Sequence, residues 1–176
     1  HALAGLLDRI VSCQEAMTAI EKQLADIVQR DTRSQRLMAA SGIGLITATA
    51  MSAGIGDFAR FPSGRHFASA LGLTPREYSS GGQRKLGRIT KRGDVYLRTL
   101  LIHGPRSALM AAHKAKKRGQ PLDRTQHWAL ALAERKGHNK AVVALANKTA
   151  RRLWAAEHHG ASFDPEHVSR REQAAG

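Results

Sequence analysis

The sequence is poor in cysteine and in aromatic residues, and each shortage excludes a class of site. Cys13 is the only cysteine among 176 residues, so the chain cannot form an internal disulfide or a cysteine-based zinc site. Two tryptophans and two tyrosines are too few for the aromatic platform on which single strands stack. No apolar run reaches the roughly 18 residues of a membrane span. We therefore expect a protein of the cytoplasm that has no membrane partner.

Acidic residues are also scarce, and the balance of charge points to a polyanion. The chain has 28 Lys and Arg against 14 Asp and Glu, a net charge of +14. So basic a chain most often binds phosphate, and nucleic acid is the leading polyanion. Its carboxylates do not cluster as in a two-metal nuclease, and its nine histidines lack the spacing of zinc ligands. We expect neither a metal nor another cofactor in this chain.

The most regular pattern lies in residues 1–31, where apolar residues recur at alternating spacings of three and four. They are Leu3, Leu6, Ile10, Cys13, Met17, Ile20, Leu24 and Ile27. Such a narrow seam is typical of a coiled coil and predicts a homodimer or a higher homo-oligomer. The alternative is a helix packed on its own domain. Because the chain begins with His1 and not Met, we also expect it to be a fragment of a longer protein.

Residues 32–160 read as one all-α domain of short, alanine-rich helices separated by glycine. We predict helices over about 34–41, 44–54, 63–71, 94–117, 123–135 and 140–157. Asp94, Asp123 and Asn139 are the expected N-caps. Gly104 and Pro105 are expected to break or kink the fourth of these helices.

The remaining segments carry no helical pattern. A long loop is predicted from residue 72 to about residue 93, and a flexible tail over residues 161–176. No stretch alternates convincingly with the period of two that marks a strand, so we expect almost no sheet.

Residues 37–56 have the form of a helix-hairpin-helix element, with Gly42 and Gly44 at its turn. Glycines permit a tight turn and close approach to a phosphate, toward which the free N–H groups of the second helix then point. Ile43 would pack between the two helices. The alternative is a purely structural turn in a helical bundle.

The loop around residues 74–98 carries the sharpest signal, because adjacent hydroxyls precede a glycine pair in a strongly basic segment. Backbone N–H groups at Gly81 and Gly82 are expected to cradle a phosphodiester. The expected nucleic-acid contacts in this segment are Arg76, Arg84, Lys85, Arg88, Lys91, Arg92 and Arg98. Cations would also stabilise the charge that develops if Ser79 or Ser80 attacked phosphorus. Charge alone leaves plain DNA or RNA contact and catalysis both open.

Residues 37–155 as a set resemble a known family. The Gly-Ile-Gly hairpin, the Gly-Leu-Thr-Pro-Arg turn, the Ser-Gly pair, the run ITKRGD and the segment KGHNKAVVALANKTARRLWA occur in this order. Together they are similar to the C-terminal transposase domain of the insertion-sequence one-ten family, the Piv-like DNA recombinases guided by a bridge RNA. The heptad helix resembles the coiled-coil segment that precedes that domain.

The resemblance implies a DNA transposase or recombinase of a prokaryotic, nucleoid-associated kind, with DNA and a guide RNA as partners. It implies a serine that becomes bonded to DNA, assigned to Ser80, with Ser79 as the second choice. It also implies an N-terminal RNase-H-like domain that binds magnesium and is absent from this chain, so the chain alone should be inactive. Two other interpretations are a non-catalytic helix-hairpin-helix module that binds DNA or RNA, and a coiled-coil assembly protein whose charge serves solubility.

Overall fold

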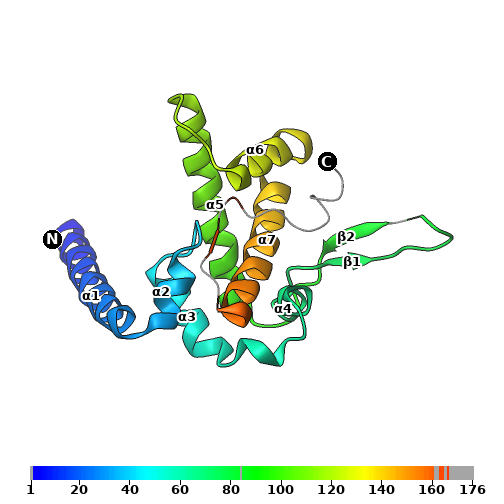
Figure 1. Cartoon of the computed structure of the whole chain (residues 1–176). Helices are drawn as coiled ribbons and strands as arrows, with labels where there is room; N and C mark the ends of the chain where they lie inside the picture. The colour runs from blue at the N-terminus through cyan, green and yellow to red at the C-terminus, as the bar shows by residue number, and fades with distance from the viewer. Residues whose placement is uncertain (1, 84, 161–162, 165, 167–176) are drawn as a thin grey trace.

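The computed structural model describes residues 2–83, 85–160, 163, 164 and 166, and these form seven α-helices and one small sheet (Figure 1). The helices are α1 (Ala2–Arg30), α2 (Thr32–Met38), α3 (Leu45–Ile55), α4 (Gly64–Ala70), α5 (Val95–Lys117), α6 (Arg124–Lys136) and α7 (His138–His159), with a short 3₁₀ turn η1 (Phe58–Arg60). Strands β1 (Pro75–Glu77) and β2 (Leu86–Ile89) pair antiparallel. The predicted all-α class is confirmed. None of the helices described is long and apolar enough to cross a membrane.

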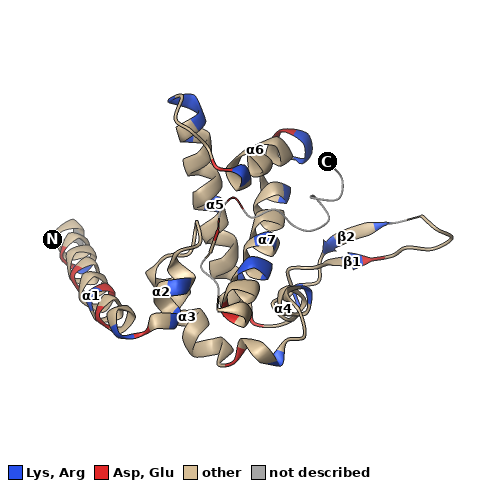
Figure 2. Cartoon of the chain, viewed as in Figure 1, with Lys and Arg blue, Asp and Glu red and all other residues tan. Residues whose placement is uncertain are grey.

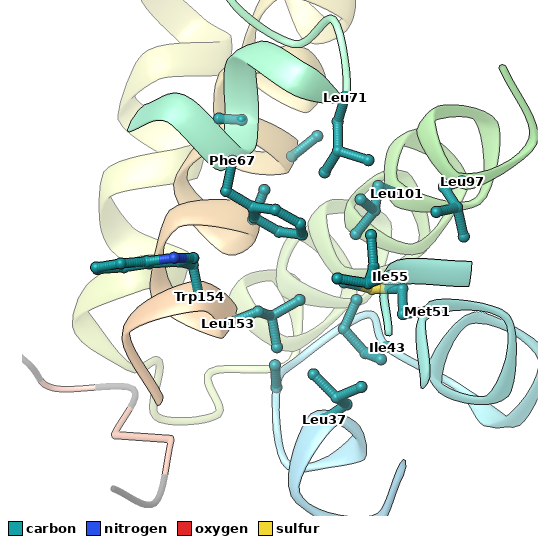
Figure 3. Packing of buried hydrophobic residues seen from close by; sticks show 14 of the residues in the cluster. Leu37, Ile43, Met51, Ile55, Phe67, Leu71, Leu97, Leu101, Leu153 and Trp154 are labelled. Atoms are coloured by element: carbon teal, nitrogen blue, oxygen red, sulfur yellow. The ribbon is translucent and has the colours of Figure 1, made fainter. Parts of the chain in front are cut away.

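The main core joins residues of α2, α3, α4, α5 and α7, with α4 and α5 packed on α7 and α3 packed on α5 (Figure 3). Phe67 of α4 is fully buried, and its ring centroid lies 5.2 Å from that of Phe58 and 5.1 Å from that of Phe61. Met51 and Leu101 are also fully buried. Each such side chain contributes roughly 1.5–3 kcal/mol through its removal from water. A second apolar cluster joins α5, α6 and α7.

Polar contacts fasten the segments around α7. Arg36 of α2 donates from Nε and Nη2 to the two carboxylate oxygens of Glu157, at 2.9 and 3.0 Å. The side chain of Glu157 is only 4% exposed, and its hydrogen bond raises the pKa of Arg36. Trp154 donates from Nε1 to the carbonyls of Phe58 and Phe61, at 3.1 and 3.0 Å. These bonds hold α2 and η1 against α7.

Asp31 forms the joint between α1 and the helical body. Its carboxylate caps α2 by accepting from the N–H of Arg33 at 3.1 Å. It also accepts from the hydroxyls of Ser34 and Ser52, at 2.5 and 2.7 Å, and so ties α3 to the same joint. These two hydroxyl bonds lead the causes that lower the pKa of Asp31 to about 2.

Beyond this joint α1 leans away from the body (Figure 1). Val28, near its end, is buried, and Leu24 is half-buried. The heptad residues from Leu3 to Ile20 are all exposed. Packing of this seam on its own domain is therefore limited to the last turns of the helix.

Three of the predicted helix boundaries need correction. Pro105 does not break α5, which runs unbroken through it from Val95 to Lys117. Asn139 is not a cap, because α7 already begins at His138 and its N-cap position is Gly137, which also ends α6. The predicted loop over residues 72–93 is wrong in part, because it contains the paired strands. Asp94 and Asp123 cap α5 and α6 as predicted.

The predicted flexible tail, residues 161–176, lies mostly outside the described residues. Of its three described residues, Phe163 packs under the guanidinium of Arg152, 4.4 Å from its ring centroid. Glu166 accepts a hydrogen bond from the backbone of Arg124 at 3.0 Å. These two residues therefore contact the body at α6 and α7.

Candidate nucleic-acid interface and nucleophile

The two strands and the turn between them form a hairpin that projects from the body beside α4 (Figure 1). Gly81 and Gly82 are its two central turn residues, with φ of 57° and 78°. The N–H of Gln83 donates to the carbonyl of Ser80 at 3.1 Å and closes the turn. Positive φ at both central positions is what a type I′ hairpin turn requires, and glycine adopts it without steric cost. The glycine pair is thus explained by local backbone geometry.

The two serines at the tip differ in what their hydroxyls contact. The Ser79 hydroxyl donates to a carboxylate oxygen of Glu77 at 2.6 Å and accepts from the N–H of Lys85 at 3.2 Å. The Ser80 hydroxyl has no hydrogen-bond partner among the residues that the structure describes. Both side chains are exposed. Ser79 therefore has a carboxylate in position to take its proton, whereas Ser80 is free to meet an external group.

The serines also lie on opposite faces of the hairpin. In an extended chain, side chains two residues apart share a face. Ser79 is on the face of Glu77, as their hydrogen bond shows, and Ser80 is on the face of Tyr78. Tyr78 lies across the second strand, where a Cβ on Gly87 would be 2.9 Å from its ring. The choice between the two candidate nucleophiles is therefore a choice between two faces.

Exposed cations follow the hairpin and its root (Figure 2). They are Arg76, Lys85, Arg88, Lys91 and Arg92. None of them forms an ion pair with a carboxylate in the described part of the chain. Arg84, the sixth cation predicted here, lies outside the described residues. The five form a basic surface that no carboxylate of the described residues neutralises, and such a surface can bind phosphate.

Close backbone contacts fix the root of the hairpin against α4. Gly93 has φ of +96°, and a Cβ there would lie 1.8 Å from the carbonyl oxygen of Ala70. A Cβ on Gly72, at φ +70°, would lie 2.1 Å from the carbonyl oxygen of Arg92. Only glycine permits both approaches, so these two residues set the direction in which the hairpin leaves the body.

Arg98 does not join the basic surface, which corrects its predicted role. The residue is 7% exposed. Its Nη1 points at the carbonyl oxygens of Leu71, Gly93 and Asp94, at 3.4 to 3.5 Å. The guanidinium therefore makes its contacts inside the protein, where it holds the end of α4 and the start of α5 together at the hairpin root.

The Gly42–Gly44 turn packs on α5. Gly42 has φ of +84°, and a Cβ there would lie 2.7 Å from the carbonyl of Gly104. In return a Cβ on Gly104 would lie 1.7 Å from the carbonyl oxygen of Gly42. Ile43 is buried in the core. Gly44 is exposed at the start of α3, with nothing within 4 Å of its Cβ position. Gly42 thus has a packing role, and phosphate contact at this turn stays a prediction.

The part of the chain that the structure describes contains no group of three or more His, Cys, Asp or Glu able to hold a metal ion. His158 is stacked on Trp154, with ring centroids 4.5 Å apart. Magnesium in an N-terminal domain, which the resemblance implies, stays a prediction.

The chain is similar in sequence to proteins named as transposases. The model of the Transposase IS116/IS110/IS902 family matches residues 34–120. A probable family 20 transposase of Pseudomonas aeruginosa is 44% identical over 153 residues, 87% of this chain and 44% of that protein. The transposase for insertion sequence element IS1111A of Coxiella burnetii is 39% identical over 88% of this chain and 41% of its own length. The transposase for IS1328 of Yersinia enterocolitica is 35% identical over 85% of this chain and 43% of its own length.

The chain spans less than half the length of these relatives. The match nevertheless takes in the turn, the hairpin and α5. On these matches, the chain belongs to the IS116/IS110/IS902 family of transposases, with residues 34–120 as the matched family domain.

Proposed function

We propose that this chain is the DNA-joining domain of a transposase, in which the hairpin binds DNA and Ser80 supplies the nucleophile for strand cleavage and exchange. The observation that carries the proposal is the hairpin tip: an exposed hydroxyl without a partner in the described chain, beside cations that no described carboxylate neutralises. Relatives named as transposases support the reaction class.

In the proposed step the Ser80 oxygen attacks the phosphorus of a phosphodiester. A serine–phosphate bond forms, the bond from phosphorus to one deoxyribose oxygen breaks, and that oxygen leaves with a proton. Arg76 and Lys85 would offset the negative charge that accumulates on the phosphate oxygens. Glu77 lies on the other face, so the base that takes the proton of Ser80 comes from outside the hairpin. If Ser79 is the nucleophile instead, Glu77 is that base.

Three partners complete the proposal: a magnesium-binding RNase-H-like domain, a guide RNA, and a second copy of this chain joined through α1. The exposed seam of α1 supports the last of these, because it leaves apolar side chains in water. They are Leu3, Leu6, Ile10, Met17 and Ile20, each more than half exposed. Cys13 continues the seam and is exposed. In a parallel, in-register pair the two Cys13 thiols would face each other, so mild oxidation should give a covalent dimer that Cys13→Ser abolishes.

The test of the reaction is a covalent protein–DNA adduct. The chain is joined to the RNase-H-like domain and supplied with magnesium, guide RNA and target DNA. Ser80→Ala should abolish the adduct and leave DNA affinity nearly unchanged. An adduct that survives Ser80→Ala but not Ser79→Ala moves the assignment to the other face. An adduct that survives both changes refutes serine catalysis, and the chain is then a non-catalytic DNA- or RNA-binding module.

Salt dependence tests the binding itself. If six or more phosphates are contacted, affinity for DNA should fall by about 10³-fold or more between about 50 and 200 mM salt. Affinity that hardly changes with salt would refute both nucleic-acid interpretations and leave an assembly protein whose charge serves solubility.

A further inference from the structure

Two arginines from different helices meet on the body near the root of the hairpin. Gly64 opens α4 and lies against the backbone of Arg151 on α7, where an added Cβ would be 2.9 Å from the Arg151 carbonyl oxygen and 3.1 Å from its Cα. This close approach places Arg65, the next residue of α4, beside Arg151. Both side chains are exposed.

The two positive charges are close enough to affect each other. The pKa of Arg151 is lowered, first by partial burial of its guanidinium and then by the charge of Arg65. In the described part of the chain neither arginine forms a hydrogen bond or an ion pair. Six residues further along α7, Glu157 neutralises Arg36 in a bidentate pair. The same helix thus supplies a carboxylate for one arginine and none for Arg151, so packing has brought two like charges together without compensation.

The Arg65–Arg151 pair lies at the start of α4, and the other end of this helix leads into the hairpin. Figure 1 shows α4 between α7 and the hairpin, and the far end of α4 contacts the hairpin root through Gly72 and Arg92. A helix of this length is about 10 Å long. Successive phosphates of one DNA strand are about 3.4 Å apart along the duplex axis, so about three phosphates would separate the pair from the root. One DNA backbone can therefore contact both.

We propose that Arg65 and Arg151 form a second phosphate clamp, which holds the backbone of the same DNA duplex a few nucleotides from the phosphate at the hairpin tip. The inference rests on the proposed function and adds a specific site to it. A guanidinium presents a planar fork of donors that matches phosphate oxygens, and two forks from different helices fix the direction of a strand as well as its position. An anion between them would also remove the repulsion that the folded chain carries.

The test is the double variant Arg65→Gln/Arg151→Gln of the 176-residue chain, with a duplex of about 30 base pairs, and the logarithm of affinity measured against the logarithm of salt concentration by fluorescence anisotropy. If each arginine neutralises one phosphate, the slope should become shallower by about 1.8. The matched control is Lys114→Gln/Lys117→Gln at the far end of α5, which removes the same charge from two exposed lysines. The control should change the slope by less than half as much.

Each outcome decides the question. An equal change in both variants means that only total charge matters and overturns the clamp. The double variant could keep the parent's slope of log affinity against log salt while Arg76→Gln/Arg88→Gln loses binding. That result overturns the clamp and leaves the hairpin proposal intact. Unchanged binding in all variants refutes the hairpin proposal as well. If the double variant loses affinity for an RNA duplex but not for DNA, the assignment to DNA is wrong. Thermal unfolding separates binding from folding: because a repulsion is removed, the double variant should melt no lower than the parent, and a clear drop overturns the clamp in favour of a structural role.

Discussion

Replacement of Gly93 by alanine should separate the hairpin root from α4. Gly93 and Gly81 both have positive φ, at +96° and +57°. An L-residue in this region costs roughly 1–2 kcal/mol, so both Gly93→Ala and Gly81→Ala carry that loss. Gly81 has nothing within 4 Å of its Cβ position, and its loss should end there. At Gly93 the new Cβ would lie 1.8 Å from the Ala70 carbonyl oxygen, about half of an ordinary contact distance.

The clash between the new Cβ at Gly93 and the Ala70 carbonyl should cause a measurable loss of stability. The backbone of Gly93 must move by more than ~1 Å, which disturbs the buried guanidinium of Arg98 and its carbonyl partners. We expect Gly93→Ala to lose about 3 kcal/mol or more, against about 1 kcal/mol for Gly81→Ala. For a chain of this size 1 kcal/mol lowers the melting temperature by about 2–4 °C, so the two variants should differ by at least about 4 °C in thermal unfolding followed by circular dichroism at 222 nm. Melting temperatures within ~1 °C of each other would refute the inference that Gly93 holds the hairpin root against α4.

Further predictions concern the joints around α7 and α1. Asp31→Asn keeps a side-chain oxygen that can cap α2 but removes the carboxylate charge. Because the folded pKa of Asp31 is about 2 against 3.8 unfolded, its charge stabilises the chain above pH 3.8 and that contribution is lost as pH falls toward 2. Across this range of pH, the melting temperature of the variant should therefore change less with pH than that of the parent. An equal change in both would contradict this role of the Asp31 carboxylate. Trp154→Phe leaves two carbonyls without their donor and should cost about 1–3 kcal/mol in urea unfolding, whereas no loss would show that water replaces the indole. Arg36→Met should destabilise more than Arg36→Met combined with Glu157→Gln, because the single change leaves the nearly buried carboxylate with only Arg33, 3.5 Å away, among the ion-pair partners in the described chain. Additive losses would exclude this coupling.

The helices and two of the three caps could be predicted because their signals are local. Asp94 and Asp123 accept from the N–H three residues ahead, at 2.9 and 2.7 Å, as the sequence pattern of an N-cap predicts. Asn139 carries the same pattern but fails, because Gly137 alone separates α6 from α7 and leaves no extended residue at position 139. Gly104 and Pro105 were expected to break or kink α5, but the helix runs unbroken from Val95 to Lys117, and its Gly104 lies against the backbone of Gly42.

The hairpin could not be recognised by apolar alternation, because neither of its faces is buried. β1 is exposed at all three residues and β2 at three of four, so no core selects one set of side chains as apolar. The signal that was available is the glycine pair itself. Two residues that tolerate positive φ, between segments of extended chain, are a hairpin turn signal regardless of what flanks them.

Arg98 shows why the sequence alone does not tell which cations of a basic segment are exposed and which are buried. Arg92 and Arg98 differ in the sequence only by their place relative to the cap at Asp94. Six residues after Arg92, and one turn into α5, the side chain of Arg98 contacts the carbonyl of Leu71 at the end of α4 and that of Asp94 before α5, instead of solvent. Leu71 is 27 residues away, so that contact depends on how α4 and α5 pack, whereas Gly93 and Asp94 are local partners. No local pattern encodes that packing.

The glycine pair and the cations therefore support the proposed function to different degrees. A type I′ turn needs two residues with positive φ whether or not a phosphate binds there, so Gly81 and Gly82 alone carry little information about ligands. The cations are different, because folding gains nothing from like charges that no carboxylate neutralises. Some arginines elsewhere in the described chain are paired, stacked on rings or bonded to carbonyls: Arg36 with Glu157, Arg60 over Phe61, Arg98 inside the root. An external polyanion would neutralise the cations along the hairpin and at Arg65–Arg151, which no described carboxylate pairs with, and the proposed DNA-binding surface rests on these cations.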